Sequence, residues 1–188
     1  MEELGLSREQ LCNADESGLF WKLLPQKTYV SSLEKMAPGA KMEKQRVAFL
    51  CCSNATGSHQ LKLLVVGHSR KPRCFKGFDC SVHYRHSKSA WMTGAIFKDW
   101  FHRSFIPEVT KFLTQKGLPV EAIVLIDNAP SYPPENELKS KDGSILTMFM
   151  PPNENPPNNP WIKTQLGLRN FITETVFWLP LLQRGVIC

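Results

Sequence analysis

One unbroken apolar run constrains the fold more than any other feature of this sequence. Residues 122–126 read AIVLI and are followed directly by Asp127, Asn128, Ala129 and Pro130. A run without alternation of polar and apolar residues is typical of a strand that is covered on both faces, as parallel strands are. A second run, ILTMF at 145–149, has the same character and ends before two prolines. Two such strands indicate an α/β layer fold.

The segments that precede this run complete the expected sheet. Residues 46–66 contain two β-rich runs around a Ser-Asn-Ala-Thr-Gly turn, which predicts a hairpin. Residues 11–18, LCNADESG, predict a strand that runs into a turn. Residues 91–116 have the apolar spacing of a helix, and Pro107 predicts the start of a second helix there. We therefore expect an α/β fold with a mixed sheet flanked by helices.

Composition excludes several classes of protein. With 188 residues, 42% of them hydrophobic, the chain is long enough for one domain with a core and too apolar to be disordered throughout. The net charge of +6 weakly favours polyanionic partners. The six cysteines show no disulfide framework, so we expect reduced thiols and a location in the cytosol or the nucleus. No run is long enough for a membrane helix, and the opening residues are too acidic for a secretory signal.

Two acids stand where α/β enzymes place catalytic groups. Asp15 and Asp127 are each expected at the carboxyl end of an apolar strand, where open sheets bind their ligands. Two carboxylates on neighbouring strands would repel each other, and a divalent cation relieves that repulsion. Carboxylate oxygens together with water and phosphate suit Mg²⁺, and such metal sites cleave phosphodiesters. Taken alone, each acid could equally be part of a turn or a strand end.

The sequence motifs around these acids resemble those of a known family. They run in the family's order over about residues 11–153: NADESGLFWKLLPQKTYV, APG at 37–39, RVAFLCCSNATGSHQLKLLVVG, KPRCFK, AWMTGAIFKDWFHRSFIPEV and LIDNAPSYP. They resemble the catalytic core of pogo-type DDE superfamily endonucleases and transposases, in the Jerky and Tigger branch. The resemblance implies an RNase H-like fold, an ancestral Mg²⁺ site, a DNA partner and a nuclear location. Asp15 matches the first catalytic, metal-binding acid and Asp127 the second.

The sequence departs from this family in two places. Family members usually carry helix-turn-helix domains before the core, whereas this chain opens almost directly on the first catalytic strand. The family's third acid lies in a segment like Gln-Pro-Met-Asp-Gln after its Pro-Pro-Asn. Here the corresponding residues are Asn159, Pro160, Trp161, Ile162 and Lys163, so the third acid is absent.

The genetic code offers an explanation for the missing acid. Trp is encoded only by TGG and every Ile codon begins with AT, so the Trp161–Ile162 codons read two bases later contain GAT, which encodes Asp. That Asp would lie about 35 residues after Asp127, the separation that the resemblance implies. The residues after 153 also lack hydrophobic periodicity. We therefore interpret 154–188 as an out-of-frame tail; a merely divergent tail is the alternative.

This interpretation divides the chain into three parts. Residues 1–10 are a short N-terminal segment, for which Ser7 as an N-cap predicts one short helix. Residues 11–153 are the DDE endonuclease core, truncated at its C-terminal side. We expect the tail at 154–188 to be loosely ordered, because an out-of-frame sequence was never selected to pack on this core.

The leading functional hypothesis is a transposon-derived DDE domain that binds DNA and has lost catalysis with its third acid. One alternative is an active Mg²⁺-dependent nuclease in which Glu135 or Glu137 substitutes for that acid. Another is a protein-interaction module without enzymatic activity. A basic stretch could hold DNA phosphates weakly and without sequence specificity, or could be a solvated loop. Its cations are Arg70, Lys71, Arg73, Lys76, Arg85 and Lys88, with Phe75 and Tyr84 between them.

Two further sets of residues suggest functional sites, but their spacing favours a structural interpretation. Cys74, Cys80, His83 and His86 could form a zinc site, but the gap between the cysteines is longer than structural zinc sites favour. Trp91, Trp100 and Phe105 could offer a stacking platform. Their helical spacing instead favours three core residues.

Overall fold

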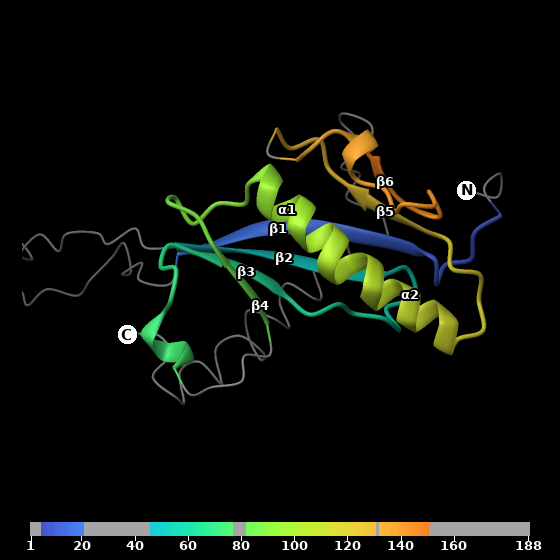
Figure 1. The fold of residues 1–188 in the computed structure, drawn as a ribbon, viewed down its shortest axis with the longest axis horizontal. Helices are drawn as coiled ribbons and strands as arrows, with labels where there is room; N and C mark the ends of the chain where they lie inside the picture. Colours follow the sequence, from blue (N-terminus) through green and yellow to red (C-terminus); the bar gives the residue numbers. More distant parts are fainter. Residues whose placement is uncertain (1–4, 21–45, 77–81, 131, 151–188) are drawn as a thin grey trace, which may run out of the picture.

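The computed structural model describes residues 5–20, 46–76, 82–130 and 132–150. They form one six-stranded mixed sheet in the order β4-β3-β2-β1-β5-β6 (Figure 1). The strands are β1 (Leu11–Phe20), β2 (Arg46–Asn54), β3 (Leu64–Gly67), β4 (His83–His86), β5 (Ala122–Ile126) and β6 (Ile145–Phe149). The predicted α/β class with an RNase H-like mixed sheet is confirmed. The proposed tail at 154–188 lies outside the described residues.

Strand direction divides the sheet into two parts. β1, β2 and β3 pair antiparallel, so the predicted hairpin at 46–66 is confirmed. β5 pairs parallel with both β1 and β6, and β4 pairs parallel with β3. β5 is therefore an inner strand, and Ile123 and Ile126 on it are 5% and 0% exposed. The prediction that this apolar run is covered on both faces is confirmed.

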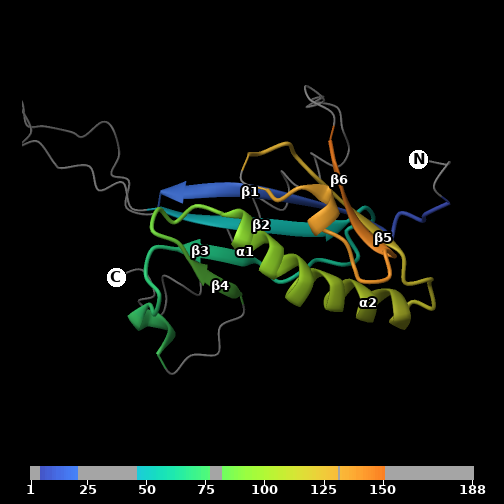
Figure 2. The ribbon, with the colours of Figure 1, turned by 45° about the horizontal axis from the view of Figure 1, so that its top comes forward.

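One helical rod crosses a single face of the sheet (Figures 1 and 2). It consists of α1 (Gly94–Trp100), the π-helical segment η3 (Phe101–Phe105) and α2 (Ile106–Gln115). The hydroxyl oxygen of Thr93 accepts the Ile96 N–H and caps the start, and Gly117 with a φ of +67° ends the last turn. The prediction of a second helix with Pro107 in its first turn is confirmed, since α2 begins at Ile106, and η3 joins it to α1 without a break.

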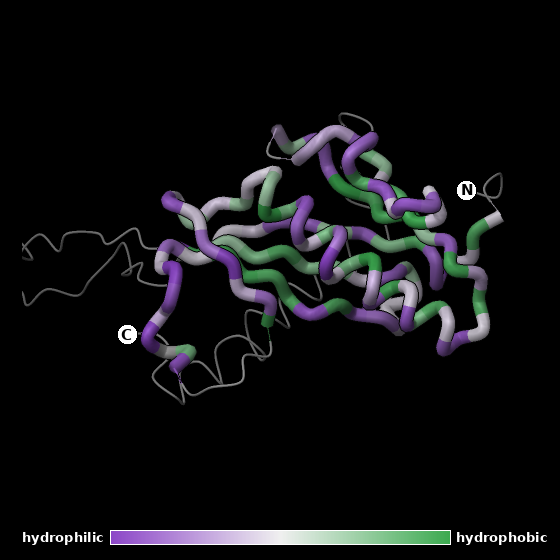
Figure 3. The backbone as a smooth tube through the Cα atoms, in the orientation of Figure 1, coloured by the Kyte–Doolittle hydropathy of each residue, from purple (hydrophilic) through white to green (hydrophobic). Residues whose placement is uncertain are grey.

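The rod closes the main hydrophobic core. Trp100 is 2% exposed and Phe105 is 0% exposed, so their predicted core positions are confirmed. They pack with inward residues of the strands, such as Leu50, Val124 and Ile126. A smaller cluster on the opposite face contains Phe49, Cys51 and Val65 and no residue of α1 or α2. The strands that carry both clusters are the most hydrophobic segments in Figure 3.

The structure corrects three other local predictions. β1 does not end in a turn at NADESG, because every residue from Cys12 to Phe20 pairs with β2. Residues 8–10 form a turn, not a helix, in which the Ser7 N–H and hydroxyl both donate to Gln10 Oε1. The basic stretch at 70–88, which is interpreted above as a possible solvated loop, contains β4, which pairs with β3.

The cysteines and helices of the described residues have these properties. Cys12, Cys51 and Cys52 are buried and belong to no disulfide. Burial raises the pKa of Cys12 to about 12, so this thiol stays protonated and unreactive at neutral pH. Among the described helices, none is both long and apolar enough to cross a membrane.

Gly67 provides a test of packing between β3 and β4. A Cβ atom at this buried glycine would overlap the Tyr84 hydroxyl, which donates to the Ser69 carbonyl at 2.6 Å. We expect Gly67→Ala to lower the free energy of unfolding by about 1–3 kcal/mol, because the tyrosine ring must move. Urea denaturation measures the loss. Gly18→Ala is the control, since a Cβ there meets no atom within 4 Å, and equal losses in the two variants would contradict the prediction.

Candidate active site

The strand register brings the two candidate acids to neighbouring positions. β1 and β5 pair in parallel, with Asn13 opposite Leu125. Two residues further along each chain come Asp15 and Asp127, so the register continued past the end of β5 places them side by side. Asp15 is not at a strand end as expected: it lies within β1, opposite Cys51 of β2. Asp127 is the exposed first residue after β5.

Strand alternation places Asp15 on the sheet face that the helical rod leaves uncovered. Side chains alternate along a strand, and Cys12 and Ala14 point into the core beneath the rod. Asp15 therefore points to the other face, together with its cross-strand partner Cys51. Asp127 follows the end of β5, and its charge acts on Glu16 and Tyr132.

The pKa values of two nearby groups show that negative charge accumulates here. Burial raises the pKa of Glu16, and the carboxylates of Asp127 and Asp15 raise it further. A hydrogen bond from the Met92 N–H to Glu16 Oε1, at 3.3 Å, opposes this shift. Burial and then the same carboxylates raise the pKa of the Tyr132 hydroxyl. Asp15, Asp127, Glu16 and Tyr132 are thus electrostatically coupled.

Sequence reasoning missed the last two members of this group. Glu16 follows Asp15 directly, but strand alternation places it on the opposite face, under the helical rod. Tyr132 belongs to the DNAPSYP segment that follows β5. The sequence offered one signal for each residue. Glu16 directly follows a candidate acid, and Tyr132 belongs to a family motif.

The donor set fits a divalent cation only in part. Asp15 and Asp127 offer the hard carboxylate oxygens that Mg²⁺ prefers, and the repulsion among these acids is the kind that a cation relieves. Within the described ranges, however, no three His, Cys, Asp or Glu side chains form a group that could hold a metal ion. Asp15 and Asp127 are therefore candidate ligands without a third His, Cys, Asp or Glu grouped with them among the described residues.

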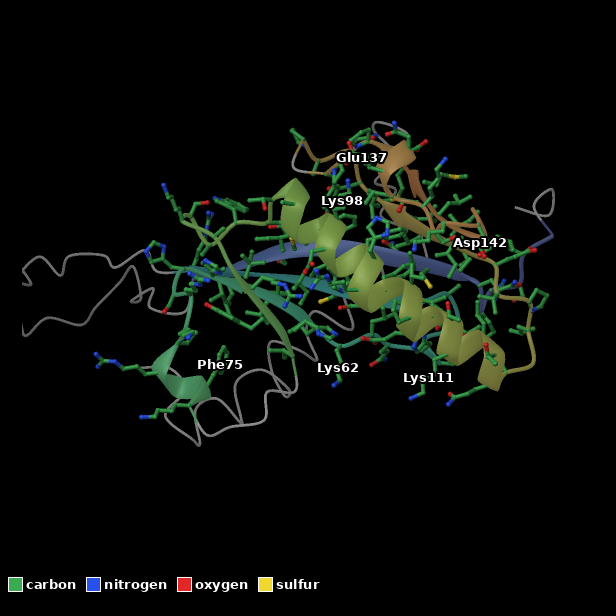
Figure 4. The ribbon with its side chains drawn as sticks, viewed as in Figure 1. Lys62, Phe75, Lys98, Lys111, Glu137 and Asp142 are labelled. Atoms are coloured by element: carbon green, nitrogen blue, oxygen red, sulfur yellow. The ribbon has the colours of Figure 1, made fainter. Side chains whose placement is uncertain are left out.

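A cleft of about 680 Å³ adjoins the coupled group. Its walls come from the start of α1 and from the segment after β5, and they include Met92 and Tyr132. Lys98 and Glu137 close one side with an ion pair of 2.8 Å (Figure 4). Glu135 Oε1 in turn accepts the Phe149 N–H at 3.2 Å. The two glutamates considered as substitute acids are thus held by partners of their own, in the short helix η4 (Glu135–Glu137).

The basic stretch contains one cation in an ion pair and five exposed cations. Arg85 is paired: its Nε and Nη2 donate to Asp99 Oδ2 at 2.9 and 2.7 Å. The other five predicted DNA-binding side chains are exposed: Arg70, Lys71, Arg73, Lys76 and Lys88. Arg73 lies in the short helix η2 (Arg73–Phe75), and the chain around it is mainly hydrophilic (Figure 3). The rings of Phe75 and Tyr84 pack edge to face at 4.9 Å.

The zinc alternative gains no support from the described part of this stretch. His83 and His86 are three residues apart on β4, so their side chains point to opposite faces of the strand. His83 Nε2 instead lies 3.0 Å from Glu108 Oε1. Cys80 lies outside the described residues.

Comparison with known proteins identifies the family. Residues 44–161 match the family described as DDE superfamily endonuclease. The chain belongs to this family. It is 43% identical to human Jerky protein homolog over 152 residues, which are 79% of this chain and 26% of that protein. It is 36% identical to human Tigger transposable element-derived protein 7 over 159 residues, which are 81% of this chain and 29% of that protein.

These relatives confirm the Jerky and Tigger resemblance seen in the sequence motifs. The chain spans only about a quarter of the length of the curated relatives it matches. It is also similar to a solved structure of a Mos1 transposase paired-end complex with left transposon end. That similarity has a TM-score of 0.45 and 13% identity, and it covers 87% of this chain and 42% of that one.

The raised pKa of Glu16 predicts how the free energy of unfolding changes with pH. Because folding raises the pKa of Glu16, the folded state holds its proton more tightly than the unfolded state does. The stability contributed by this residue is therefore greatest at acidic pH and falls as the pH rises through the folded pKa. We expect Glu16→Gln to be more stable than the wild type at pH 7, and the difference to vanish at pH values below the ordinary glutamate range.

Thermal unfolding of the two proteins from acidic to neutral pH measures this effect. Glu121→Gln, at an exposed position before β5, is the control for loss of one negative charge. A Glu16→Gln variant that is less stable than the wild type at pH 7 would contradict the prediction.

Proposed function

We propose that this chain is a transposon-derived DDE domain that binds DNA at the Asp15–Asp127 face and does not cleave it. The observation that carries the proposal is the parallel register of β1 and β5, which pairs Asn13 with Leu125, two residues before Asp15 and Asp127. Their joint effect on Glu16 and Tyr132 supports a site where negative charge is concentrated. Membership of the DDE superfamily endonuclease family supports phosphodiesters as the ligand class.

In this proposal, Asp15 and Asp127 would hold Mg²⁺ together with a backbone phosphate of the DNA. The ion supplies charge neutralisation when it is bound. The two carboxylates would repel the phosphate without the ion and would position it by holding the ion, and the cleft beside Tyr132 would accommodate the adjoining strand. Without a third carboxylate the second metal position is poorly held, so binding proceeds without cleavage.

The frameshift account of the missing acid is part of this proposal. The family match runs to residue 161, eight residues into the segment interpreted as the tail. Residue 161 is the tryptophan whose codon, joined to that of Ile162, contains the shifted GAT.

Affinity would come mainly from exposed cations. The five exposed side chains of the basic stretch can each neutralise a phosphate, whereas Arg85 is already paired with Asp99. Such contacts do not read sequence, so we expect weak and non-specific binding. A DNA-binding role also favours the nucleus over the cytosol as the location.

A salt titration tests DNA binding. We expect the full chain to bind duplex DNA of unrelated sequences equally, with the logarithm of affinity falling linearly against that of salt by about 0.9 per phosphate contacted. Lys71→Ala with Arg73→Ala should lower both affinity and slope. Lys111→Ala, at an exposed position on α2 (Figure 4), is the control for charge loss alone. Absence of binding at low salt would overturn the proposal and favour a protein-interaction module.

A nicking assay with supercoiled DNA and Mg²⁺ tests the catalytic part. We expect no cleavage above background. Cleavage that Asp15→Asn abolishes would show an active nuclease instead. Glu137→Gln would then test that residue as the substitute acid, which its ion pair with Lys98 argues against.

A further inference from the structure

Trp91 is exposed and yet ordered. Its side chain is 48% exposed, which contradicts its predicted core position, whereas Trp100 is buried. The guanidinium of Arg46 lies over the indole, 3.3 Å from the ring centroid. Arg46 Nη2 also donates to the Ser89 carbonyl at 3.1 Å. One cation is thus fixed against the ring, in the geometry of a cation–π contact.

A strained turn fixes the backbone that carries this tryptophan. Ala90 has a φ of +53°, and among the described residues it is the non-glycine residue with positive φ. Its N–H donates to the Ser87 carbonyl at 3.1 Å, while the Ser87 hydroxyl donates to the Trp91 carbonyl at 2.7 Å. A left-handed alanine costs roughly 1 kcal/mol or more and persists only where its surroundings impose it. The turn therefore holds Trp91 in a position that local preferences alone would not select.

This turn borders the candidate active site. Met92, the next residue, donates its N–H to Glu16 and also lines the cleft. Arg46 acts on the same glutamate, since its charge lowers the Glu16 pKa against the effect of burial. Trp91 and Arg46 consequently form a pair, here named the Trp91–Arg46 platform, beside the residue that follows Asp15.

We propose that the Trp91–Arg46 platform stacks an unpaired nucleobase of a DNA strand that passes through the adjoining cleft lined by Met92 and Tyr132. This inference rests on the proposed function. An exposed indole is a sequence-tolerant surface for a base, and the guanidinium adds positive charge where the backbone phosphates pass. Bases inside a duplex are already stacked on each other, so the platform distinguishes unpaired from paired DNA.

Binding to two matched DNAs tests the platform. One is a fluorescently labelled blunt duplex, and the other is the same duplex with a short single-stranded overhang. We expect the wild-type chain to prefer the overhang. Trp91→Ala should weaken overhang binding roughly fivefold or more, while affinity for the blunt duplex stays the same. Trp91→Phe should retain most of the preference, because a phenyl ring still stacks.

A second pair of variants separates stacking from charge. Arg46→Gln removes the cation over the indole, and Lys111→Gln removes one cation from a distant turn of α2. We expect only Arg46→Gln to reduce the preference for the overhang. Thermal melting verifies that each variant is folded, and Trp91→Phe provides the comparison if Trp91→Ala is not.

The outcomes separate this inference from the proposed function. If the wild type binds both DNAs and Trp91→Ala changes neither affinity, or lowers both equally, the platform is overturned and the DNA-binding proposal stands. If the wild type binds neither DNA at low salt, the proposed function fails and the platform fails with it.

Discussion

Reading the codons from 154 onward in the shifted frame is expected to turn an inactive chain into a Mg²⁺-dependent nicking enzyme. The shift replaces the Trp161–Ile162 junction by an Asp, which adds the acid that the described site lacks. Charge stabilisation by a fully held metal site contributes several kcal/mol to a transition state. We therefore expect nicking to rise by at least roughly 100-fold over the chain as given.

Supercoiled DNA incubated with each chain in Mg²⁺, and with a chelator as the blank, measures this difference. Asp15→Asn in the reframed chain is the matched control, because it removes one expected metal ligand and leaves the new segment intact. Equal activity of the chain as given and the reframed chain would end the frameshift account. Activity of the reframed chain that survives Asp15→Asn would remove this residue from the site.

The second large effect concerns stability. Trp100 is 2% exposed, and its ring packs against those of Phe97 and Phe105 at centroid distances of 5.3 and 5.5 Å. Its indole N–H has no hydrogen-bond partner among the described residues, so its contribution is packing alone. We expect Trp100→Ala to cost about 3–5 kcal/mol in the free energy of unfolding. That loss is a large part of the 5–15 kcal/mol, roughly, that a domain has.

Urea denaturation of Trp100→Ala and Trp91→Ala compares the same substitution at a buried and an exposed site. We expect Trp91→Ala to cost only about 0.5–1 kcal/mol, mainly the lost contact with Arg46. Similar losses in both variants would show that the rod is not the stabilising layer of this sheet.

Features set by local pattern could be predicted from the sequence. The apolar run of β5 predicts a buried inner strand, and the structure places it between β1 and β6 with Ile123 and Ile126 buried. The hairpin of β2 and β3 follows from its turn residues. The family resemblance likewise rests on short contiguous motifs, which can be recognised in the sequence alone.

Features set by tertiary pairing could not be predicted in this way. The polar residues after Ala14 indicate a turn by themselves, but pairing with β2 keeps them extended through Phe20. Trp91 has helical spacing relative to later residues, yet the helix begins only after Thr93. Whether an aromatic residue two positions before a helix cap is buried depends on contacts such as that with Arg46, which spacing does not encode.

The two acids differ in how firmly the backbone fixes them, and this has a consequence for ion selectivity. Asp15 belongs to a strand that remains paired with β2 beyond it, whereas Asp127 follows the last residue of β5. If Asp15 and Asp127 hold a cation as proposed, the ligand within the paired strand would be the less adjustable one, and cations of different radius would be accommodated mainly by the Asp127 side chain. Substitutions after β5 should therefore change the preference among Mg²⁺, Mn²⁺ and Ca²⁺, whereas substitutions around Asp15 should change affinity for all three together.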